Sequence, residues 1–350
     1  MNEETYAELQ SFCDENKIEN GAREILKRVR PHWDAGNIAI KHFTEGITNK
    51  LVGCYKESEG FGKDVVLIRI YGANTELIID RNTEKNNILF LSKHGLCPPL
   101  YAVFENGLAY GFCPGKTLDC SSVREYRVQI AKEMVRLHSL KSDSADNIKT
   151  TPGLFSKLKK WLLVAPTSFD ESSKQERFVT EIGSLEKLKD EYELLKDTIE
   201  SMDTSVVMSH NDLLLKNIIY DETTDKISFI DHEYAMFNYR PYDIGNHFCE
   251  YAGVDDVDFS RYPDKQYQLE WLRSYLEEWN THNGLTCAVT DEEVQKLYVQ
   301  VNKCALAAHF FWGLWALIQS KYSKIDFNYF DYGIMKLKEY FARKEEFLSL

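Results

Sequence analysis

Residues 209–250 read SHNDLLLKNIIYDETTDKISFIDHEYAMFNYRPYDIGNHFCE, and this stretch decides the fold. Asp212 stands two positions after His210, Asn217 follows five positions later, and an apolar run then leads into Asp231. An isolated His-x-Asp would more simply organise a turn, because Asp and Asn side chains bond to their own backbone. The complete set, with an apolar strand that ends in an acid, instead favours a functional site.

This spacing is that of a kinase catalytic loop followed by its metal-binding acid. Phosphoryl transfer from a nucleotide needs an acceptor for the proton of the attacking hydroxyl group, and it needs oxygen ligands for magnesium. We therefore expect Asp212 to be the catalytic base. Asn217 and Asp231 are expected to hold the metal ions.

The composition is that of a folded globular chain with an acidic balance. At about 150 residues per domain, 350 residues predict two domains. Hydrophobic residues make up 43% of the chain and charged residues 28%, which is ordinary. The net charge of -13 argues against sequence-independent binding of nucleic acid and weakly favours a cationic small molecule as partner.

No targeting, membrane or disulfide pattern is visible. The acidic N-terminal segment, MNEETYAELQ, does not have the form of a secretory signal. The most apolar window, Cys304–Ile318, is shorter than the ~20 residues of a membrane helix and contains His309, so we expect a buried helix and no membrane span. The eight Cys form no C-x-x-C pair. Reduced thiols in a cytoplasmic protein are the simplest interpretation.

The pattern of apolar residues predicts an α+β organisation with a boundary at Pro114–Gly115. Before it we expect a helix over residues 3–30, antiparallel strands over 38–79, a helix over 81–94, and a hairpin that turns at Asn106-Gly107. After it we expect an irregular segment over 142–173 and helices over 121–140, 181–201, 266–283, 291–322 and 329–348. The expected domains are residues 1–113 and 114–350.

Three segments closely resemble the choline/ethanolamine kinase family: SHNDLLLKNIIYD, FIDHEYAMFNYRPYDIGNHFCEYAG and HFFWGLWALIQSKYSKIDFNYFDYG. The resemblance extends from about Phe43 to Tyr340, and LLLKN and HFFWGLWALIQ look most like ethanolamine kinases. It implies a two-lobe protein-kinase-like fold, with a small antiparallel-sheet lobe for the nucleotide and a larger helical lobe for catalysis and amine binding. It also implies ATP as co-substrate and two Mg²⁺ ions. A homodimer is compatible with the family, although we see no interface pattern.

The resemblance also implies roles for residues of an amine pocket and of the catalytic loop. Asp243 would support the loop, and His210 more simply braces it than takes part in acid–base chemistry. The side chains implied at the amine, beside Asp212, are Tyr234, Glu250, Trp312, Trp315 and Tyr332. Aromatic faces and carboxylates attract a cation, and a primary ammonium has three N–H donors that a quaternary ammonium lacks. On spacing alone, Trp312 and Trp315 would be core residues of an apolar helix.

The expected ATP contacts are Gly46, Thr48, Asn49, Arg69, Glu84 and Phe112. The first three lie in the loop Glu45–Lys50, which on its own would be a plain hairpin turn. The family usually has Gly-Gly at its start, and a carboxylate at Glu45 would repel ATP. Arg69 would contact phosphate with Glu84 as its ion-pair partner, and Phe112 belongs to the hinge beside adenine.

The resemblance implies ATP-dependent phosphorylation of ethanolamine to phosphoethanolamine, for the synthesis of phosphatidylethanolamine. Three alternatives stay open: the same chemistry on choline, phosphorylation of an aminoglycoside or another hydroxylated amine, and a catalytically silent kinase-fold scaffold. The tryptophan pair argues against a wide saccharide cleft. The complete set of Asp212, Asn217 and Asp231 argues against a silent scaffold, whereas Glu45 favours one.

Overall fold

The computed structural model describes residues 6–350, apart from 44–48, 63, 73–77, 143–147 and 324. The chain divides into two compact units. Unit 1 comprises Met1–Gly115 with Ser323–Phe327, and unit 2 comprises Lys116–Tyr322 with Asn328–Leu350.

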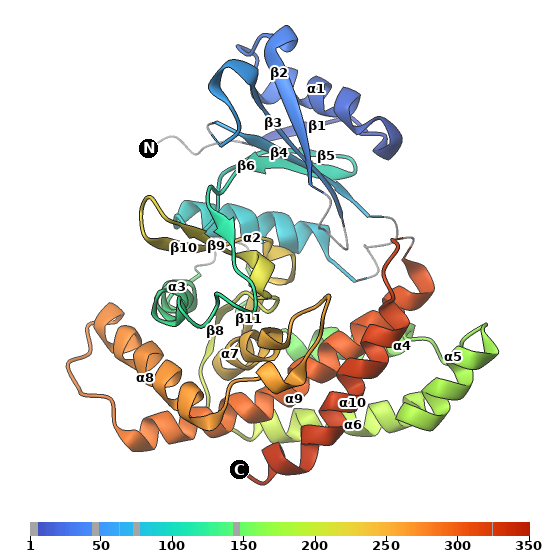
Figure 1. Cartoon of the computed structure of the whole chain (residues 1–350), viewed down its shortest axis with the longest axis vertical. Coiled ribbons are helices and arrows are strands. Elements are labelled where there is room, and N and C mark those ends of the chain that lie inside the picture. Colours follow the sequence, from blue (N-terminus) through green and yellow to red (C-terminus); the bar gives the residue numbers. More distant parts are fainter. Residues whose placement is uncertain (1–5, 44–48, 63, 73–77, 143–147, 324) are drawn as a thin grey trace. The chain divides into compact units, whose positions relative to one another are not determined.

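Unit 1 is built on a six-stranded sheet in the order β1-β5-β6-β4-β3-β2 (Figure 1). The strands are β1 (Ala7–Leu9), β2 (Ile38–Phe43), β3 (Asn49–Lys56), β4 (Val66–Tyr71), β5 (Leu100–Phe104) and β6 (Gly107–Gly111). All neighbouring pairs are antiparallel except β1 and β5. The expectation of a helix over residues 3–30 is wrong in its first part, because Ala7–Leu9 pairs with the free edge of β5.

The described residues of unit 1 include two α-helices. The helix α1 (Ile18–Val29) contributes Ile25 and Leu26 to a core that it shares with Val52 and Ile68 of the sheet. The helix α2 (Arg81–Lys93) begins after Asp80, whose carboxylate accepts the N–H groups of residues 82 and 83. Such a cap satisfies donors that the first turn of a helix leaves unpaired. It explains why the helical pattern starts at residue 81.

The predicted hairpin between β5 and β6 is present, but its turn lies at Glu105-Asn106, one residue earlier than expected. Gly107 is the first residue of β6, where a Cβ atom would lie 2.1 Å from the carbonyl oxygen of Arg69. Asn106 instead fastens the N-terminal segment, because its amide accepts the N–H of Cys13 at 2.9 Å and donates to the carbonyl of Cys13 at 2.8 Å.

Unit 2 is mainly helical (Figure 1). Its longer helices are α3 (Arg127–His138), α4 (Leu154–Val164), α5 (Ser172–Arg177), α6 (Leu185–Glu200), α7 (Arg240–Cys249), α8 (Lys265–His282), α9 (Asp291–Tyr322) and α10 (Tyr329–Leu348). The last three agree with the expected ranges to within one residue. The expectation of an irregular segment over 142–173 is wrong for Leu154–Val164, because Leu158 and Trp161 bury one side of a helix there.

Short strands in unit 2 carry the loops that matter for chemistry. Strand β8 (Val206–Ser209) pairs with β11 (Met236–Tyr239) in an antiparallel arrangement. Strand β9 (Ile218–Asp221) pairs with β10 (Lys226–Phe229) on one side and with β7 (Lys116–Thr117) on the other. The Ser209–Asn217 segment therefore connects two small sheets.

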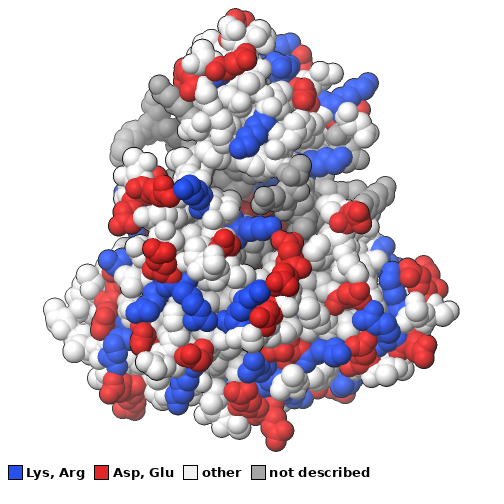
Figure 2. Space-filling model, in the orientation of Figure 1, with Lys and Arg blue, Asp and Glu red and all other residues white. Residues whose placement is uncertain are grey.

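The helix α9 lies at the centre of unit 2, packed against α7 and α10. It is long and apolar enough to cross a membrane, but 94% of its most apolar window is buried inside the protein, as in a core helix. The expectation of a buried helix at Cys304–Ile318 is therefore confirmed. On the face of unit 2 shown in Figure 2, Lys and Arg side chains alternate with Asp and Glu, so this face presents neither charge alone.

Candidate active site

The loop after β8 is held by the carboxylate of Asp243, which projects from the first turn of α7. Its two oxygens accept the backbone N–H groups of His210 at 2.8 Å and of Asn211 at 2.7 Å. All three residues are fully buried. Because an ionised carboxylate is a strong acceptor, the two bonds fix the backbone immediately before Asp212.

Asn211 adopts the left-handed conformation, with φ at 64°. Asn tolerates this region better than most residues, and here its side chain compensates for the backbone. The amide nitrogen donates to the carbonyl oxygens of Ser209 and Tyr234, each at 3.1 Å, while the amide oxygen accepts from Asn238 at 2.7 Å. Asn211 thus ties the loop to β11.

His210 joins the loop to the segment that carries Asp231. Its Nε2 atom lies 2.8 Å from the carbonyl oxygen of Ile230, which can only accept, so Nε2 carries the proton. The Nδ1 atom then accepts the backbone N–H of Asp212 at 3.3 Å. Burial lowers the pKa of His210, which agrees with this neutral form. The imidazole therefore braces two backbone segments.

A second histidine, His138, is hydrogen-bonded to the carboxylate of Asp243. His138, on α3, donates from Nε2 to Asp243 Oδ2 at 3.0 Å and accepts at Nδ1 from the hydroxyl of Tyr275 at 2.7 Å. Burial lowers the pKa of His138. Burial also opposes ionisation of Asp243, but the hydrogen bonds that it accepts from the His138 side chain and from the His210 backbone outweigh this effect and lower the pKa of Asp243. Asp243 is therefore a charged anchor for the loop.

The β9–β10 hairpin brings Asn217 and Asp231 to one end. Its register pairs Ile218 with Phe229, and the carbonyl of Asn217 accepts the N–H of Ile230 at 3.0 Å. The Asn217 amide nitrogen donates to the carbonyl of Asp212 at 2.9 Å, which commits the nitrogen and leaves the amide oxygen for other partners. Asp231, two residues after the end of β10, adopts the left-handed conformation, with φ at 61°.

Three other carboxylates lie close enough to Asp212 to affect its ionisation. Burial raises its pKa well above the ordinary range, and the negative charges of Asp231, Glu250 and Glu233 raise it further, while the cation of Lys336 opposes them. Such a concentration of negative charge suits a bound cation. Asn217 and Asp231 supply the amide and carboxylate oxygens that magnesium prefers.

Across the described part of the chain, no group of three or more His, Cys, Asp or Glu side chains is arranged to hold a metal ion alone. Magnesium commonly binds through one or two protein side chains together with substrate phosphates and water. The donor set of Asn217 and Asp231 therefore fits an ion that arrives with a nucleotide.

Comparison with known proteins decides the family. The model of the choline/ethanolamine kinase family matches residues 40–341. Ethanolamine kinase 1 of Mus musculus is 44% identical over 339 residues, which cover 96% of this chain and 92% of that protein. This chain belongs to the choline/ethanolamine kinase family. Membership implies ATP as co-substrate and a divalent metal ion.

Solved structures of the family agree with the fold. The ethanolamine kinase of Plasmodium vivax superposes with a TM-score of 0.79 at 26% identity, covering 94% of this chain and 89% of that one. The choline kinase of Cryptosporidium parvum gives a TM-score of 0.76 at 21% identity, with coverages of 95% and 96%. The expected kinase-like fold is confirmed: an antiparallel-sheet N-terminal region is followed by a mainly helical C-terminal part.

The five residues that the family resemblance places at an amine lie together in unit 2. We call them the aromatic–acid cluster, which consists of Tyr234, Trp312, Trp315, Tyr332 and Glu250. The Trp312 ring stands edge-to-face to Tyr234 at 5.1 Å and to Trp315 at 5.5 Å between centroids. All five are buried, with exposed fractions between 2% and 9%. The two tryptophans are thus part of the core, as their spacing alone suggested.

The polar atoms of the tryptophans are satisfied within unit 2. Trp312 donates from Nε1 to the amide oxygen of Asn246 at 2.7 Å, and Trp315 donates to the hydroxyl of Tyr234 at 2.8 Å. These bonds fix the planes of the rings. Rings held in this way can present a defined face to a cation.

Glu250 forms an ion pair that sequence reasoning missed. Its Oε1 atom lies 2.9 Å from Nζ of Lys336 on α10, and the lysine is fully buried. The two residues are 86 positions apart, and Lys336 lies in an ordinary amphipathic helix. No local signal marks it, apart from a charge on the buried side of the helix.

The residues expected at ATP lie in unit 1, apart from Gly46 and Thr48, which fall outside the described residues, as does Glu45. Arg69 and Glu84 form the expected ion pair, and Arg81 donates to the other oxygen of Glu84 at 2.8 Å. Both members of the pair are buried. Asn49 begins β3, and Phe112 packs on Phe61 with centroids 5.0 Å apart.

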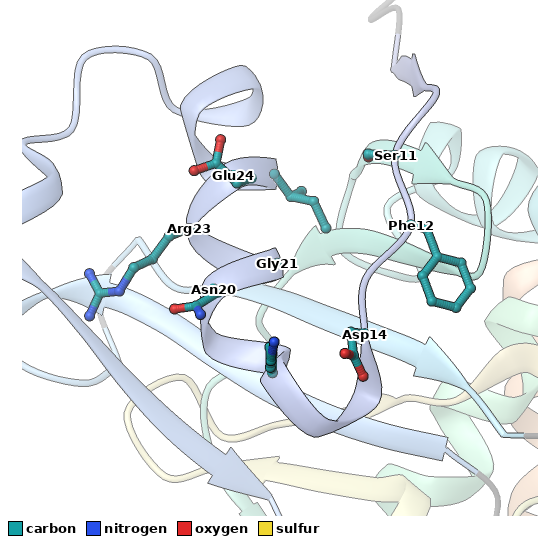
Figure 3. A pocket seen from close by; sticks show the side chains of 9 residues that line it. Ser11, Phe12, Asp14, Asn20, Gly21, Arg23 and Glu24 are labelled. Atoms are coloured by element: carbon teal, nitrogen blue, oxygen red, sulfur yellow. The ribbon is translucent and has the colours of Figure 1, made fainter.

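A groove elsewhere in unit 1 contains none of the expected residues. Its lining includes Phe12, Asp14 and Arg23, from the N-terminal segment and α1 (Figure 3). Because its polar side chains point in different directions and two thirds of Phe12 is exposed, the groove has no convergent set of polar groups.

Proposed function

We propose that this chain is an ATP-dependent ethanolamine kinase that converts ethanolamine to phosphoethanolamine. The identity of 44% to an ethanolamine kinase over nearly the whole chain carries the proposal. The solved structure with the highest TM-score among those compared above is also an ethanolamine kinase. We place the reaction in the cytoplasm, at the start of phosphatidylethanolamine synthesis.

The chemistry assigned to the catalytic loop is phosphoryl transfer to a hydroxyl group. The substrate oxygen forms a bond to the γ-phosphorus, the bond from this phosphorus to the β,γ-bridging oxygen breaks, and ADP leaves. Asp212 accepts or orients the proton that the hydroxyl loses. His210 and Asp243 support this role, because they hold the backbone N–H groups of the loop up to and including that of Asp212.

Asn217 and Asp231 are the proposed metal ligands, and we propose that two Mg²⁺ ions act. When bound, magnesium would offset the negative charge that develops on the phosphates. The closeness of Asn217 to the Asp212 backbone supports a shared site, because one hydrogen bond joins them at 2.9 Å. The raised pKa of Asp212 supports it as well, since a bound cation would favour the ionised form of this carboxylate.

The aromatic–acid cluster is the proposed site for the substrate's ammonium group. Tyr234, Trp312, Trp315 and Tyr332 would offer aromatic faces, and Glu250 would offer a carboxylate. The charge of Glu250 is among those that raise the pKa of Asp212, which supports binding of the ammonium group of a small amino alcohol near the proposed base.

For ATP we propose Arg69 as the cation for the phosphates, with Glu84 holding it. Their buried pairing supports this role, because a guanidinium that is already oriented loses little freedom when it binds phosphate. Asn49 and Phe112, with Gly46 and Thr48, are the other proposed ATP contacts.

A coupled assay for ADP release, with ethanolamine and choline side by side, tests the proposal. We expect a higher kcat/KM for ethanolamine, and phosphoethanolamine as the product. A higher kcat/KM for choline would identify choline as the substrate instead. An absence of turnover with either amine would favour a catalytically silent scaffold. Asp212→Asn serves as the control for contaminating kinase activity.

A further inference from the structure

Lys336 lies at the candidate site, but the proposed reaction gives it no task. It lies on the third turn of the 20-residue helix α10 and has no exposed surface. A lysine ammonium is strongly hydrated, and removing it from water costs several kcal/mol. Its retention inside unit 2 therefore requires a compensating partner.

That partner is Glu250, at the carboxyl end of α7. The Nζ–Oε1 distance of 2.9 Å is a good hydrogen bond as well as an ion pair. Burial is the largest influence on the pKa of Lys336 and acts to lower it, but the negative charge of Glu250 and its hydrogen bond hold that pKa above its ordinary value. Lys336 is therefore a permanent cation inside the aromatic–acid cluster.

The pairing uses only one side of the carboxylate. Lys336 occupies Oε1, and Oε2 accepts no hydrogen bond from the residues that the structure describes. Lys336 also lies 5.3 Å from the centre of the Tyr332 ring. The lysine thus fixes Glu250 between two helices, offsets part of its charge, and leaves one oxygen as a directional acceptor.

This arrangement treats two kinds of ammonium differently. A primary ammonium can donate an N–H to Oε2, whereas a quaternary ammonium has no N–H and gains only from charge and from aromatic faces. Lys336 reduces the attraction of Glu250 for the charge of either ammonium, but only the primary ammonium keeps a hydrogen bond to Oε2. A site built to receive a hydrogen bond discriminates against a ligand that lacks the donor.

We propose that Lys336 is a positioning residue that sets the preference for a primary over a quaternary ammonium, by holding Glu250 with one oxygen directed to the substrate. This inference rests on the proposed function. A purely structural ion pair between α10 and the end of α7 is the competing explanation. The two differ in what happens to the ratio of kcat/KM for ethanolamine to that for choline.

The experiment compares Lys336→Met, Lys336→Arg and Glu250→Gln with the parent protein, using kcat and KM for ethanolamine, choline and ATP and the melting temperature. Lys344→Met is the matched control. Lys344 lies on the same helix and pairs with Glu191 at 2.6 Å, and Glu191 is not among the charges that act on Asp212.

We expect Lys336→Met to lower the ratio about tenfold or more, through a higher KM for ethanolamine, with the KM for ATP unchanged. Lys336→Arg should keep a kcat/KM ratio close to that of the parent protein, because arginine also supplies a cation. Lys344→Met should lower only the melting temperature.

An unchanged ratio in folded Lys336→Met would overturn the proposal. If Lys336→Met does not fold, Glu250→Gln provides the test. A kcat/KM ratio in Glu250→Gln equal to that of the parent protein would show that neither Glu250 nor Lys336 sets the preference between the two amines. Absence of activity of the parent protein with both amines would overturn the proposed function instead.

Discussion

The carboxylate of Asp243 accepts the backbone N–H of His210 at 2.8 Å, across a sequence separation of 33 residues. This single contact couples α7 to the loop that carries Asp212. Asp243 receives two further bonds, from Asn211 and His138, so that all its neighbours in these contacts are donors. Only an ionised carboxylate can accept all three without offering a proton of its own.

Asp243→Asn tests this arrangement. The amide group keeps the size of the side chain but turns one acceptor into a donor, which would face an N–H group in a fully buried position. We expect a loss of about 2–4 kcal/mol in the free energy of unfolding, measured by urea denaturation, together with a lower kcat. Asp264→Asn is the control, since Asp264 caps α8 at the surface and should cost under about 1 kcal/mol. Equal losses in the two variants would contradict the assigned role.

Asp231→Asn tests the proposed metal ligand without disturbing the backbone. Asn accepts the left-handed conformation that Asp231 adopts, so the fold should be kept while the negative charge is lost. We expect magnesium-dependent ATP binding, followed by titration calorimetry, to weaken roughly tenfold or more. Asp225 is also left-handed, with φ at 51°, but lies exposed in the β9–β10 turn. Asp225→Asn should bind as the parent protein does, and a normal titration for both variants would exclude Asp231.

Asp212→Ala tests the proposed base. The proton of the attacking hydroxyl would lose its acceptor, so we expect kcat to fall by about 10²–10⁴. ATP binding should change little, because the proposed phosphate and metal contacts are other residues. Rapid-quench measurement of a single turnover, with calorimetry for ATP on the same sample, separates the two effects. A variant with near-normal turnover would remove Asp212 from the chemistry.

The sequence predicted those features that depend on neighbours along the chain. The spacing of His210, Asp212 and Asn217 lies within one loop, and α9 is a long apolar helix, so both could be recognised locally. The left-handed conformations of Asn211 and Asp231 were not foreseen. That of Asn211 is accompanied by hydrogen bonds to residues more than 20 positions away, which the local sequence does not reveal.

Features that depend on distant partners were missed. Lys336 finds Glu250 only after α7 and α10 have packed beside α9, and the strand at Ala7–Leu9 forms only because β5 offers a free edge. The helix α4 was missed for a related reason, since the Ser, Thr and Pro residues around it dominate the local pattern while its stability comes from burial of Trp161.

Histidine burial predicts a loss of stability in mild acid. Burial lowers the pKa of His247 to about 4, whereas an exposed histidine titrates near ~6.5. Between these values the unfolded chain binds a proton that the folded protein does not, so the contribution of His247 to stability is complete above about pH 6.5 and declines as the pH falls towards 4.

His247→Asn isolates this contribution. The amide can replace the ring N–H that His247 donates from Nδ1 to the Leu213 carbonyl at 3.3 Å, but it does not titrate. We compare the free energy of unfolding of the parent protein with that of the variant, measured by urea unfolding at pH 7 and at pH 5. We expect the parent protein's advantage to be about 2 kcal/mol smaller at pH 5 than at pH 7. His282→Asn, at the exposed end of α8, should show no such change. A difference between the parent protein and His247→Asn that stays constant over this range would mean that His247 accepts its proton in the folded state, and that the interior around α7 admits the charge.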